Sequence, residues 1–311
     1  MRILIASQID ETAIEALARD HDVITAFAAP PDEIERLLRD RDVLVFRSGV
    51  TITRSAMEGA PDLDLVIRAG SGLDNIDLEC VRDRGYRFER IEGPGAQAVA
   101  ELAFAFMLAL SRQLPVADRL TRQGVWAKHD LSGHLVAGKT LGVLGCGNIG
   151  RRVGEMGRAW GMRVLGSVST GISVERPDLL EREIALVDQD ELLRESDYVV
   201  VVVPLTDDTR GLIGSDQLRQ MRSGAFLVNV SRGGVVDEHA LSTALRSVDG
   251  PAGAAADVHE HEGPGTSSPL ADLDNVILTP HIGAMTVDSQ RQIGERVRAI
   301  VADHQHQQRE L

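Results

Sequence analysis

The sequence has only two cysteines, Cys80 and Cys146, among 311 residues. Two thiols are too few for a disulfide framework, and Cys146 lies within a glycine-rich stretch where a bridge is not expected. No apolar run approaches the roughly 18 residues of a membrane span. The N-terminal letters MRILIASQID pass directly from a short apolar run into polar residues, unlike a signal peptide. We therefore expect a cytoplasmic protein without a leader or a membrane anchor.

Positive charge is also scarce. Lys and Arg number 33 against 47 Asp and Glu, which gives a net charge of -14 at pH 7. Such a chain repels nucleic acid, and no basic tail or patch interrupts the excess of acid. The contents of 43% hydrophobic and 26% charged residues are those of an ordinary globular protein. The length favours two domains over one.

Short apolar runs alternate with amphipathic stretches in two series. The first series comprises RILIA, DVITAF, DVLVF, LDLVIRAG and YRFERI, and the second comprises TLGVLG, MRVLGSV, DYVVVVVP, AFLVNVS, PAGAAADV and NVILTP. This is the βαβ rhythm of parallel sheets covered by helices. The sequence therefore predicts an α/β fold with two doubly wound parallel-sheet (Rossmann-like) domains and a cleft between them.

Two long helical patterns complete the chain. Residues 98–124 predict one long helix whose apolar side includes Leu102, Phe106 and Leu110, so we expect its burial at a domain or subunit interface. Residues 287–311 predict an amphipathic helix with no strand after it.

A nucleotide-binding turn is predicted by TLGVLGCGNIG, in which a strand pattern leads into Gly145-x-Gly147-x-x-Gly150 and a helix pattern follows. Gly145 permits the tight turn, Gly147 lets the backbone approach a pyrophosphate, and Gly150 lets the helix pack on the strand. The helix N-terminus at Asn148 and Ile149 directs amide groups toward phosphate oxygens.

The acid that usually follows this turn by about twenty residues, to bind a ribose 2′-hydroxyl, is missing. Ser167, Val168, Ser169 and Thr170 stand in its place, and the first arginine beyond them is Arg176. Val168 and Ser169 are the residues we expect to border the cofactor. NAD and NADP both remain open, with NAD slightly favoured.

Three polar segments each follow a predicted buried strand. NVSRGG places Arg232 after one strand, DVHEHEG places acids after the next, and TPHIG places His281 after a third. The carboxyl ends of parallel strands meet at one sheet edge, so these side chains can converge. An arginine, a carboxylate and an imidazole suit reduction of a 2-keto acid, because the cation binds the acid, the imidazole delivers a proton, and the carboxylate keeps the imidazole charged and oriented.

GCGNIG, NVSRGGVVDE, DVHEHEGP and TPHIGAMT, in this order and spacing, resemble the D-2-hydroxyacid dehydrogenase family over essentially the whole chain. The resemblance implies a substrate-binding domain of residues 1–100 and 283–311 and a dinucleotide-binding domain of residues 101–282. It implies catalytic roles for Arg232, Glu262 and His281, and contact of Asp257 with the nicotinamide carboxamide.

This segment departs from the family pattern D-V-F-x-x-E-P. His259 stands at the aromatic position, and Gly263 separates Glu262 from Pro264. Glu260 is therefore the alternative partner for His281. The remaining alternative is that residues 260–262 form a solvated loop without a catalytic role.

The resemblance is strongest to the D-3-phosphoglycerate dehydrogenases. It implies that backbone amides at Ser71 and Gly72 bind the substrate carboxylate and that Arg47 and Arg68 meet a substrate phosphate, for which guanidinium groups are well suited. The alternative for both arginines is a structural ion pair with nearby Asp residues. Gly95-Ala96 replaces the Asn-Ser pair common in those enzymes.

Further correspondences concern the adenine and the subunit interface. PLTDDTRGLI resembles the loop over the adenine and implies contacts from Pro204 and Thr209, although an ordinary turn fits as well. Trp126 resembles a residue of the family's homodimer interface, where Lys128 could reach the neighbouring site. We expect no metal.

The sequence thus predicts an NAD(P)-dependent oxidoreductase that interconverts a D-2-hydroxy acid and its 2-keto acid, with a 3-phosphoglycerate-type substrate favoured. The alternatives are a hydroxypyruvate or glyoxylate reductase, a dehydrogenase of a specialised biosynthetic route, and an NAD(H)-sensing, corepressor-like binding protein.

Overall fold

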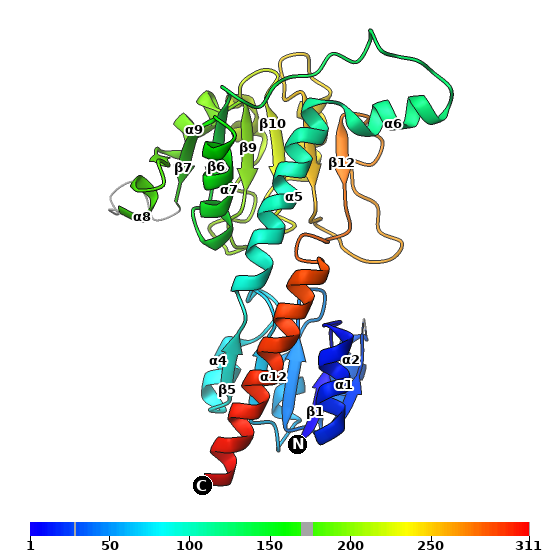
Figure 1. Cartoon of the computed structure of the whole chain (residues 1–311), viewed down its shortest axis with the longest axis vertical. Helices are drawn as coiled ribbons and strands as arrows, with labels where there is room; N and C mark the ends of the chain where they lie inside the picture. The colour runs from blue at the N-terminus through cyan, green and yellow to red at the C-terminus, as the bar shows by residue number, and fades with distance from the viewer. Residues whose placement is uncertain (28, 169–176, 311) are drawn as a thin grey trace. The chain divides into compact units, whose positions relative to one another are not determined.

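The computed structural model describes residues 1–27, 29–168 and 177–310. The chain divides into two compact units, drawn in Figure 1 with the colour following the residue number. Unit 1 consists of residues 1–98 and 284–311, and unit 2 consists of residues 99–283.

Unit 1 is built around a five-stranded, all-parallel sheet with the strand order β2-β1-β3-β4-β5. Its strands are β1 (Arg2–Ile5), β2 (Asp22–Thr25), β3 (Val43–Phe46), β4 (Leu65–Arg68) and β5 (Arg87–Arg90). Its helices are α1 (Glu11–Asp20), α2 (Pro31–Leu38), α3 (Arg54–Glu58), α4 (Leu78–Asp83) and α12 (Val287–Glu310).

Both faces of this sheet are buried. Leu4, Leu44 and Val66 pack on one face with residues of α2, α3 and α4. Their strand neighbours point to the opposite face, where α1 and α12 cover them. α12 contributes Ile293, Val297 and Val301 to this second core, so the amphipathic helix predicted near the end of the sequence completes unit 1.

Unit 2 contains a seven-stranded, all-parallel sheet with the order β12-β11-β10-β9-β6-β7-β8. Its strands are β6 (Thr140–Leu144), β7 (Arg163–Ser167), β8 (Ala185–Leu186), β9 (Tyr198–Val201), β10 (Phe226–Asn229), β11 (Gly253–Ala256) and β12 (Val276–Leu278). Its helices are α6 (Leu114–Arg122), α7 (Asn148–Ala159), α8 (Pro177–Leu180), α9 (Gln189–Glu195), α10 (Ser215–Gln220) and α11 (Glu238–Leu245). The direction of winding reverses between β6 and β9, where doubly wound sheets bind ligands.

The long helix predicted over residues 98–124 is two helices in the structure. α5 (Gly93–Ser111) begins within unit 1 and continues into unit 2, and α6 starts only at Leu114. Gln113 adopts a left-handed conformation with φ of 51°, and Pro115 occupies the first turn of α6. The break follows because a left-handed residue interrupts the helix and proline lacks the N–H that would continue it.

By length and composition, α5 could cross a membrane, with a mean hydropathy of 1.4. The expectation that no segment approaches such a span is therefore wrong for residues 93–111. However, Phe104, Phe106, Met107 and Leu110 of α5 are buried in the core of unit 2 against the sheet. Such packing is that of a core helix.

Candidate functional site

The glycine-rich turn after β6 has a distinct steric reason for each glycine. Gly145 has φ of 102°, and a Cβ there would lie 2.7 Å from the carbonyl oxygen of Val202. A Cβ on Gly150 would lie 1.9 Å from the Gly145 oxygen, whereas one on Gly147 would meet nothing within 4 Å. Gly145 and Gly150 therefore shape the turn, and Gly147 leaves its outer surface open to a ligand.

α7 begins directly beyond this turn, at Asn148 and Ile149. Gly147 is the N-cap residue, so no side chain caps the first turn of the helix. The Asn148 side chain accepts a hydrogen bond from Arg151 at 2.7 Å. An uncapped N-terminus of a twelve-residue helix behind an open glycine has the form that binds a pyrophosphate. The residues present thus fit a dinucleotide.

The ribose end of this site is described only in part. Val168 follows β7 and packs, partly buried, against the core of unit 2. Ser169, Thr170 and Arg176 lie outside the described residues, so their predicted contributions stay predictions.

The loop after β9 is held by its own hydrogen bonds. The Thr209 hydroxyl donates to the Pro204 carbonyl at 2.6 Å and accepts from the Thr206 amide at 2.8 Å. Thr209 is buried and Pro204 is exposed. Thr209 therefore shapes the loop internally, and Pro204 is the residue of the two that lies at the surface.

The three predicted catalytic residues all follow carboxyl ends of strands in the sheet of unit 2. Arg232 follows β10, Glu262 follows β11, and His281 follows β12. The Arg232 guanidinium donates to the carbonyl of Ser231 at 2.8 Å, and the residue is half-buried. β10 pairs with β11 and β11 with β12, so the three loops leave one continuous edge.

Glu262 and His281 are in direct contact. Nδ1 of His281 lies 2.8 Å from one carboxylate oxygen of Glu262 and 3.1 Å from the other. Burial raises the pKa of Glu262, but the hydrogen bond and charge of His281 and the amide of His259 outweigh it and leave the pKa below its usual value. The ionised carboxylate is therefore the favoured form of Glu262 beside His281.

Glu260, the alternative partner, lies elsewhere. Its backbone amide donates to Glu238 at 2.8 Å, and its side chain is exposed without a hydrogen bond or ion pair within the described residues. The structure thus brings Glu262, and not Glu260, to His281.

His281 itself is in the left-handed region, with φ of 57°. Few residues other than glycine adopt this conformation, and they often do so at functional sites. Asp257 fixes the surrounding turn, since its buried carboxylate accepts hydrogen bonds from the Thr279 hydroxyl and from the amides of Ile282 and Gly283, at 2.6 to 2.8 Å. Asp257 therefore supports the histidine loop, a function that the sequence did not predict.

In unit 1, Ser71 and Gly72 lie in the loop after β4, and the Ser71 carbonyl accepts a hydrogen bond from Arg90. Arg68 is only 2% exposed and lies 5.5 Å from the ring of Phe46. A Cβ on Gly70 would lie 2.5 Å from Nη1 of Arg68. Arg68 is thus packed within the unit, directly behind this glycine loop.

Arg47 is also buried, at 7% exposure, but all its guanidinium partners are neutral. Nε donates to the Ala69 carbonyl at 3.2 Å, and Nη1 donates to Gln290 at 2.8 Å. Within the described residues Arg47 forms no ion pair, so the predicted structural pair with an Asp is not seen. Burial lowers the pKa of this guanidinium. A buried cation without an anionic partner favours the binding of an anion.

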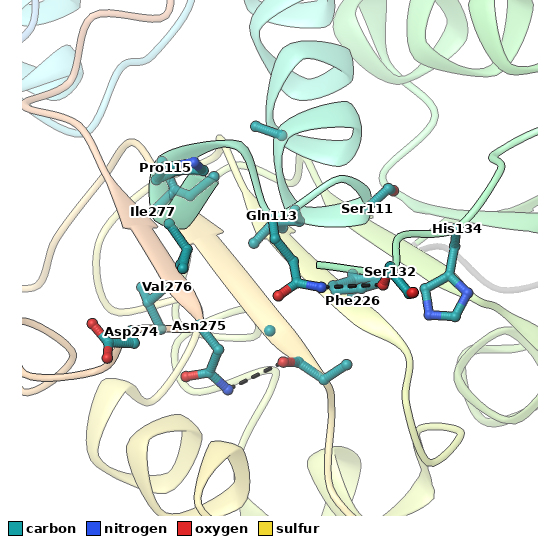
Figure 2. A pocket seen from close by; sticks show the side chains of 15 residues that line it. Ser111, Gln113, Pro115, Ser132, His134, Phe226, Asp274, Asn275, Val276 and Ile277 are labelled. Atoms are coloured by element: carbon teal, nitrogen blue, oxygen red, sulfur yellow. Dashed lines mark hydrogen bonds between the residues drawn. The ribbon is translucent and has the colours of Figure 1, made fainter. Parts of the chain in front are cut away.

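A hollow of about 380 Å³ lies at the opposite edge of the unit 2 sheet. Figure 2 shows the labelled side chains that line it, including Gln113, which donates a hydrogen bond to the Ser132 carbonyl. The first residues of β10, β11 and β12 line the hollow, so it lies at the amino ends of the strands whose carboxyl ends precede the predicted catalytic residues. It is therefore separate from the candidate site. The described residues contain no cluster of side chains suited to a metal ion.

Residues 104–283 match the family model described as the NAD binding domain of D-isomer specific 2-hydroxyacid dehydrogenases. The chain belongs to this family. The dehydrogenase family predicted from the motifs is confirmed, and unit 2 is its nicotinamide-dinucleotide domain.

Two curated relatives extend the similarity to the whole chain. The chain is 38% identical over 302 residues to D-3-phosphoglycerate dehydrogenase of Methanocaldococcus jannaschii, covering 94% of this chain and 55% of that protein. It thus spans about half the length of that relative. It is 36% identical over 297 residues to hydroxypyruvate reductase of Thermotoga maritima, covering 94% of each.

A solved structure agrees with these relatives. D-lactate dehydrogenase from Aquifex aeolicus, complexed with NAD and lactic acid, has a TM-score of 0.86 and 28% identity, covering 99% of this chain and 97% of that chain. The predicted fold class, two doubly wound α/β domains, is confirmed.

Proposed function

We propose that this protein is an NAD(P)-dependent dehydrogenase that interconverts a D-2-hydroxy acid and its 2-keto acid. The observation that supports this most directly is the Glu262–His281 pair, 2.8 Å apart at the sheet edge that also carries Arg232. The dinucleotide turn at the end of β6 in the same sheet, and membership of the family, support the same reaction.

His281, Glu262 and Arg232 each have a distinct role in the reduction. The nicotinamide, when bound, supplies the hydride for the keto carbon. Glu262 occupies Nδ1 of His281, so Nε2 is the nitrogen left to donate a proton to the carbonyl oxygen, and the Glu262 carboxylate favours the protonated imidazole that this step needs. Arg232 polarises the carbonyl and binds the substrate carboxylate.

Replacing the histidine tests this assignment. His281→Asn should abolish turnover of 2-keto acids while the dissociation constant for NADH, measured by fluorescence titration, changes less than about threefold, because the asparagine removes the proton donor and leaves the glycine turn intact. Loss of cofactor binding together with turnover would assign His281 a structural role.

For the substrate we propose an acid with a second anionic group, such as 3-phosphoglycerate. Arg47 supports this, because it is a buried guanidinium with only neutral partners among the described residues. With Arg47 intact, 3-phosphohydroxypyruvate should exceed hydroxypyruvate in kcat/KM by about 100-fold, which corresponds to about 2.7 kcal/mol. Arg47→Gln should remove this preference, and equal losses for both acids would count against a phosphate ligand.

A hydroxypyruvate or glyoxylate reductase is the second candidate. Arg68, the other arginine predicted to meet a phosphate, is packed against Phe46. The Thermotoga maritima relative named hydroxypyruvate reductase also matches the chain over 94% of both lengths. If Arg47 serves only packing, hydroxypyruvate should equal or exceed the phosphorylated acid.

The proposal extends to cofactor preference, assembly and location. We favour NAD, because the described residues at the end of β7 present no cation to a 2′-phosphate. A homodimer is proposed because Leu114, Trp126 and Leu135 expose 52%, 82% and 76% of their surfaces. A cytoplasmic location agrees with the two free cysteines.

A further inference from the structure

His259 occupies an unusual position behind the catalytic pair. Its side chain is 15% exposed, and Nε2 lies 2.9 Å from the carbonyl oxygen of Thr279. A carbonyl can only accept a hydrogen bond, so Nε2 must carry a proton. Nδ1 is buried without a hydrogen-bond partner among the described residues, and the nearest carboxylate, that of Glu238, is 3.9 Å away.

Through its ring and backbone, His259 contacts all three loops that follow β10, β11 and β12. Its amide donates to Glu262 at 3.2 Å, and its ring donates to Thr279, two residues before His281. Its carbonyl lies against Gly233, where a Cβ would approach it to 1.8 Å. One residue therefore lies between the loops of Arg232, Glu262 and His281.

The turn that holds His281 depends on the same carbonyl. The Thr279 oxygen accepts from the His281 amide at 3.1 Å as well as from His259. This bond spans two residues, a tight and weakly aligned geometry. A second donor on the oxygen fixes the peptide plane at the point where His281 enters the left-handed region.

Glu238 holds the chain that follows His259. It lies in the first turn of α11, is 6% exposed, and accepts hydrogen bonds from the Glu260 amide at 2.8 Å and the Ser268 hydroxyl at 2.6 Å. The position of the His259 peptide is thus fixed from the helix side, and the ring forms its hydrogen bond with the Thr279 carbonyl.

We propose that His259 is a positioning residue, which sets the geometry of the Glu262–His281 pair by binding the Thr279 carbonyl with its ring N–H. This inference rests on the proposed function. The hydrogen bond from His259 to Thr279 lies at a position where the family pattern has an aromatic residue. The positioning therefore depends on the N–H of the ring and not on the size of the ring.

Two substitutions separate polarity from packing. His259→Phe keeps a planar ring and the backbone amide but removes the N–H, whereas His259→Gln retains an N–H at similar reach. We expect His259→Phe to lower kcat about 5- to 10-fold, the effect of one hydrogen bond, with the KM for the keto acid and the dissociation constant for NADH within about twofold of wild type. His259→Gln should restore kcat to within about twofold.

A measurement without turnover keeps this test independent of the substrate. In ¹⁵N-histidine NMR spectra, with resonances assigned by His259→Gln and His281→Asn, the wild-type His259 ring should show a protonated Nε2. The His281 ring signals should shift in His259→Phe and return in His259→Gln. These NMR results would support the positioning role even if no keto acid were turned over, which would refute only the proposed function.

The proposal is overturned by any of three results. These are a His259 ring protonated at Nδ1 alone, unchanged His281 signals and kcat in His259→Phe, or equal losses in both variants together with a lowered melting temperature, which would indicate packing alone.

Discussion

Replacing Glu262 with glutamine tests the charge of the proposed catalytic pair, Glu262 and His281, while keeping its shape. Glutamine can still accept from Nδ1 of His281, so the variant removes the anion and leaves the contact. A hydrogen bond between charged groups contributes about 1.5–3 kcal/mol, or about 10- to 150-fold in rate. The side chains of His281 and Glu262 are 24% and 36% exposed, so solvent screens the pair and places the expected loss of kcat/KM at about 10- to 30-fold.

Initial rates of NADH oxidation with a 2-keto acid, measured across pH, are the assay. Glu260→Gln is the matched control, two residues away and without a side-chain bond in the described part of the chain. Equal losses in the two variants, or a loss confined to Glu260→Gln, would refute the assignment.

Three further predictions concern stability, cofactor binding and assembly. The pKa of Glu262 is lowered in the folded state, so its pairing with His281 stabilises the protein at pH values above the ordinary pKa of 4.5, and this stabilisation disappears as the pH falls through the folded-state pKa. The melting temperatures of wild type and Glu262→Gln should therefore converge in acid. A difference in melting temperature that stays constant with pH would contradict the pairing. Gly150→Ala should destabilise unit 2 by about 1–3 kcal/mol, because its Cβ meets the Gly145 carbonyl, whereas Gly147→Ala should keep the melting temperature and weaken NADH binding. Trp126→Ala should convert a dimer to monomers in sedimentation velocity without lowering the melting temperature of the monomer, and an unchanged sedimentation coefficient would place the interface elsewhere.

The sequence predicted those parts of the site that depend on local pattern. The glycine spacing after β6 and the polar residues after β10, β11 and β12 are readable because strand ends are marked by a change from apolar to polar letters. Parallel strands then place Arg232, Glu262 and His281 at one edge without further information. Even so, the choice between Glu260 and Glu262 rested on resemblance, since spacing alone does not show which carboxylate turns toward the histidine.

The parts that could not be predicted depend on contacts between distant segments. The support that the Asp257 carboxylate gives to the histidine loop, through three hydrogen bonds from residues 279–283, was not predicted, and its predicted contact with the cofactor stays a prediction. The break between α5 and α6 depends on the left-handed Gln113, whose letter does not distinguish it from a helical glutamine, together with Pro115, a readable helix breaker that the prediction of one long helix did not use. The sequence showed only that His259 replaces an aromatic residue of the family pattern. It did not predict the hydrogen bond to Thr279, which lies twenty residues further along the chain.

The two-part composition of unit 1 has a consequence for how the protein is made. The strands of its sheet leave the ribosome before unit 2, but the helix α12 that covers one face with Ile293, Val297 and Val301 is synthesised only after the whole of unit 2. Unit 2 is one continuous segment and can fold while the chain is still growing, whereas unit 1 must wait with an apolar sheet face uncovered. The nascent chain therefore exposes this apolar sheet face until α12 has been synthesised.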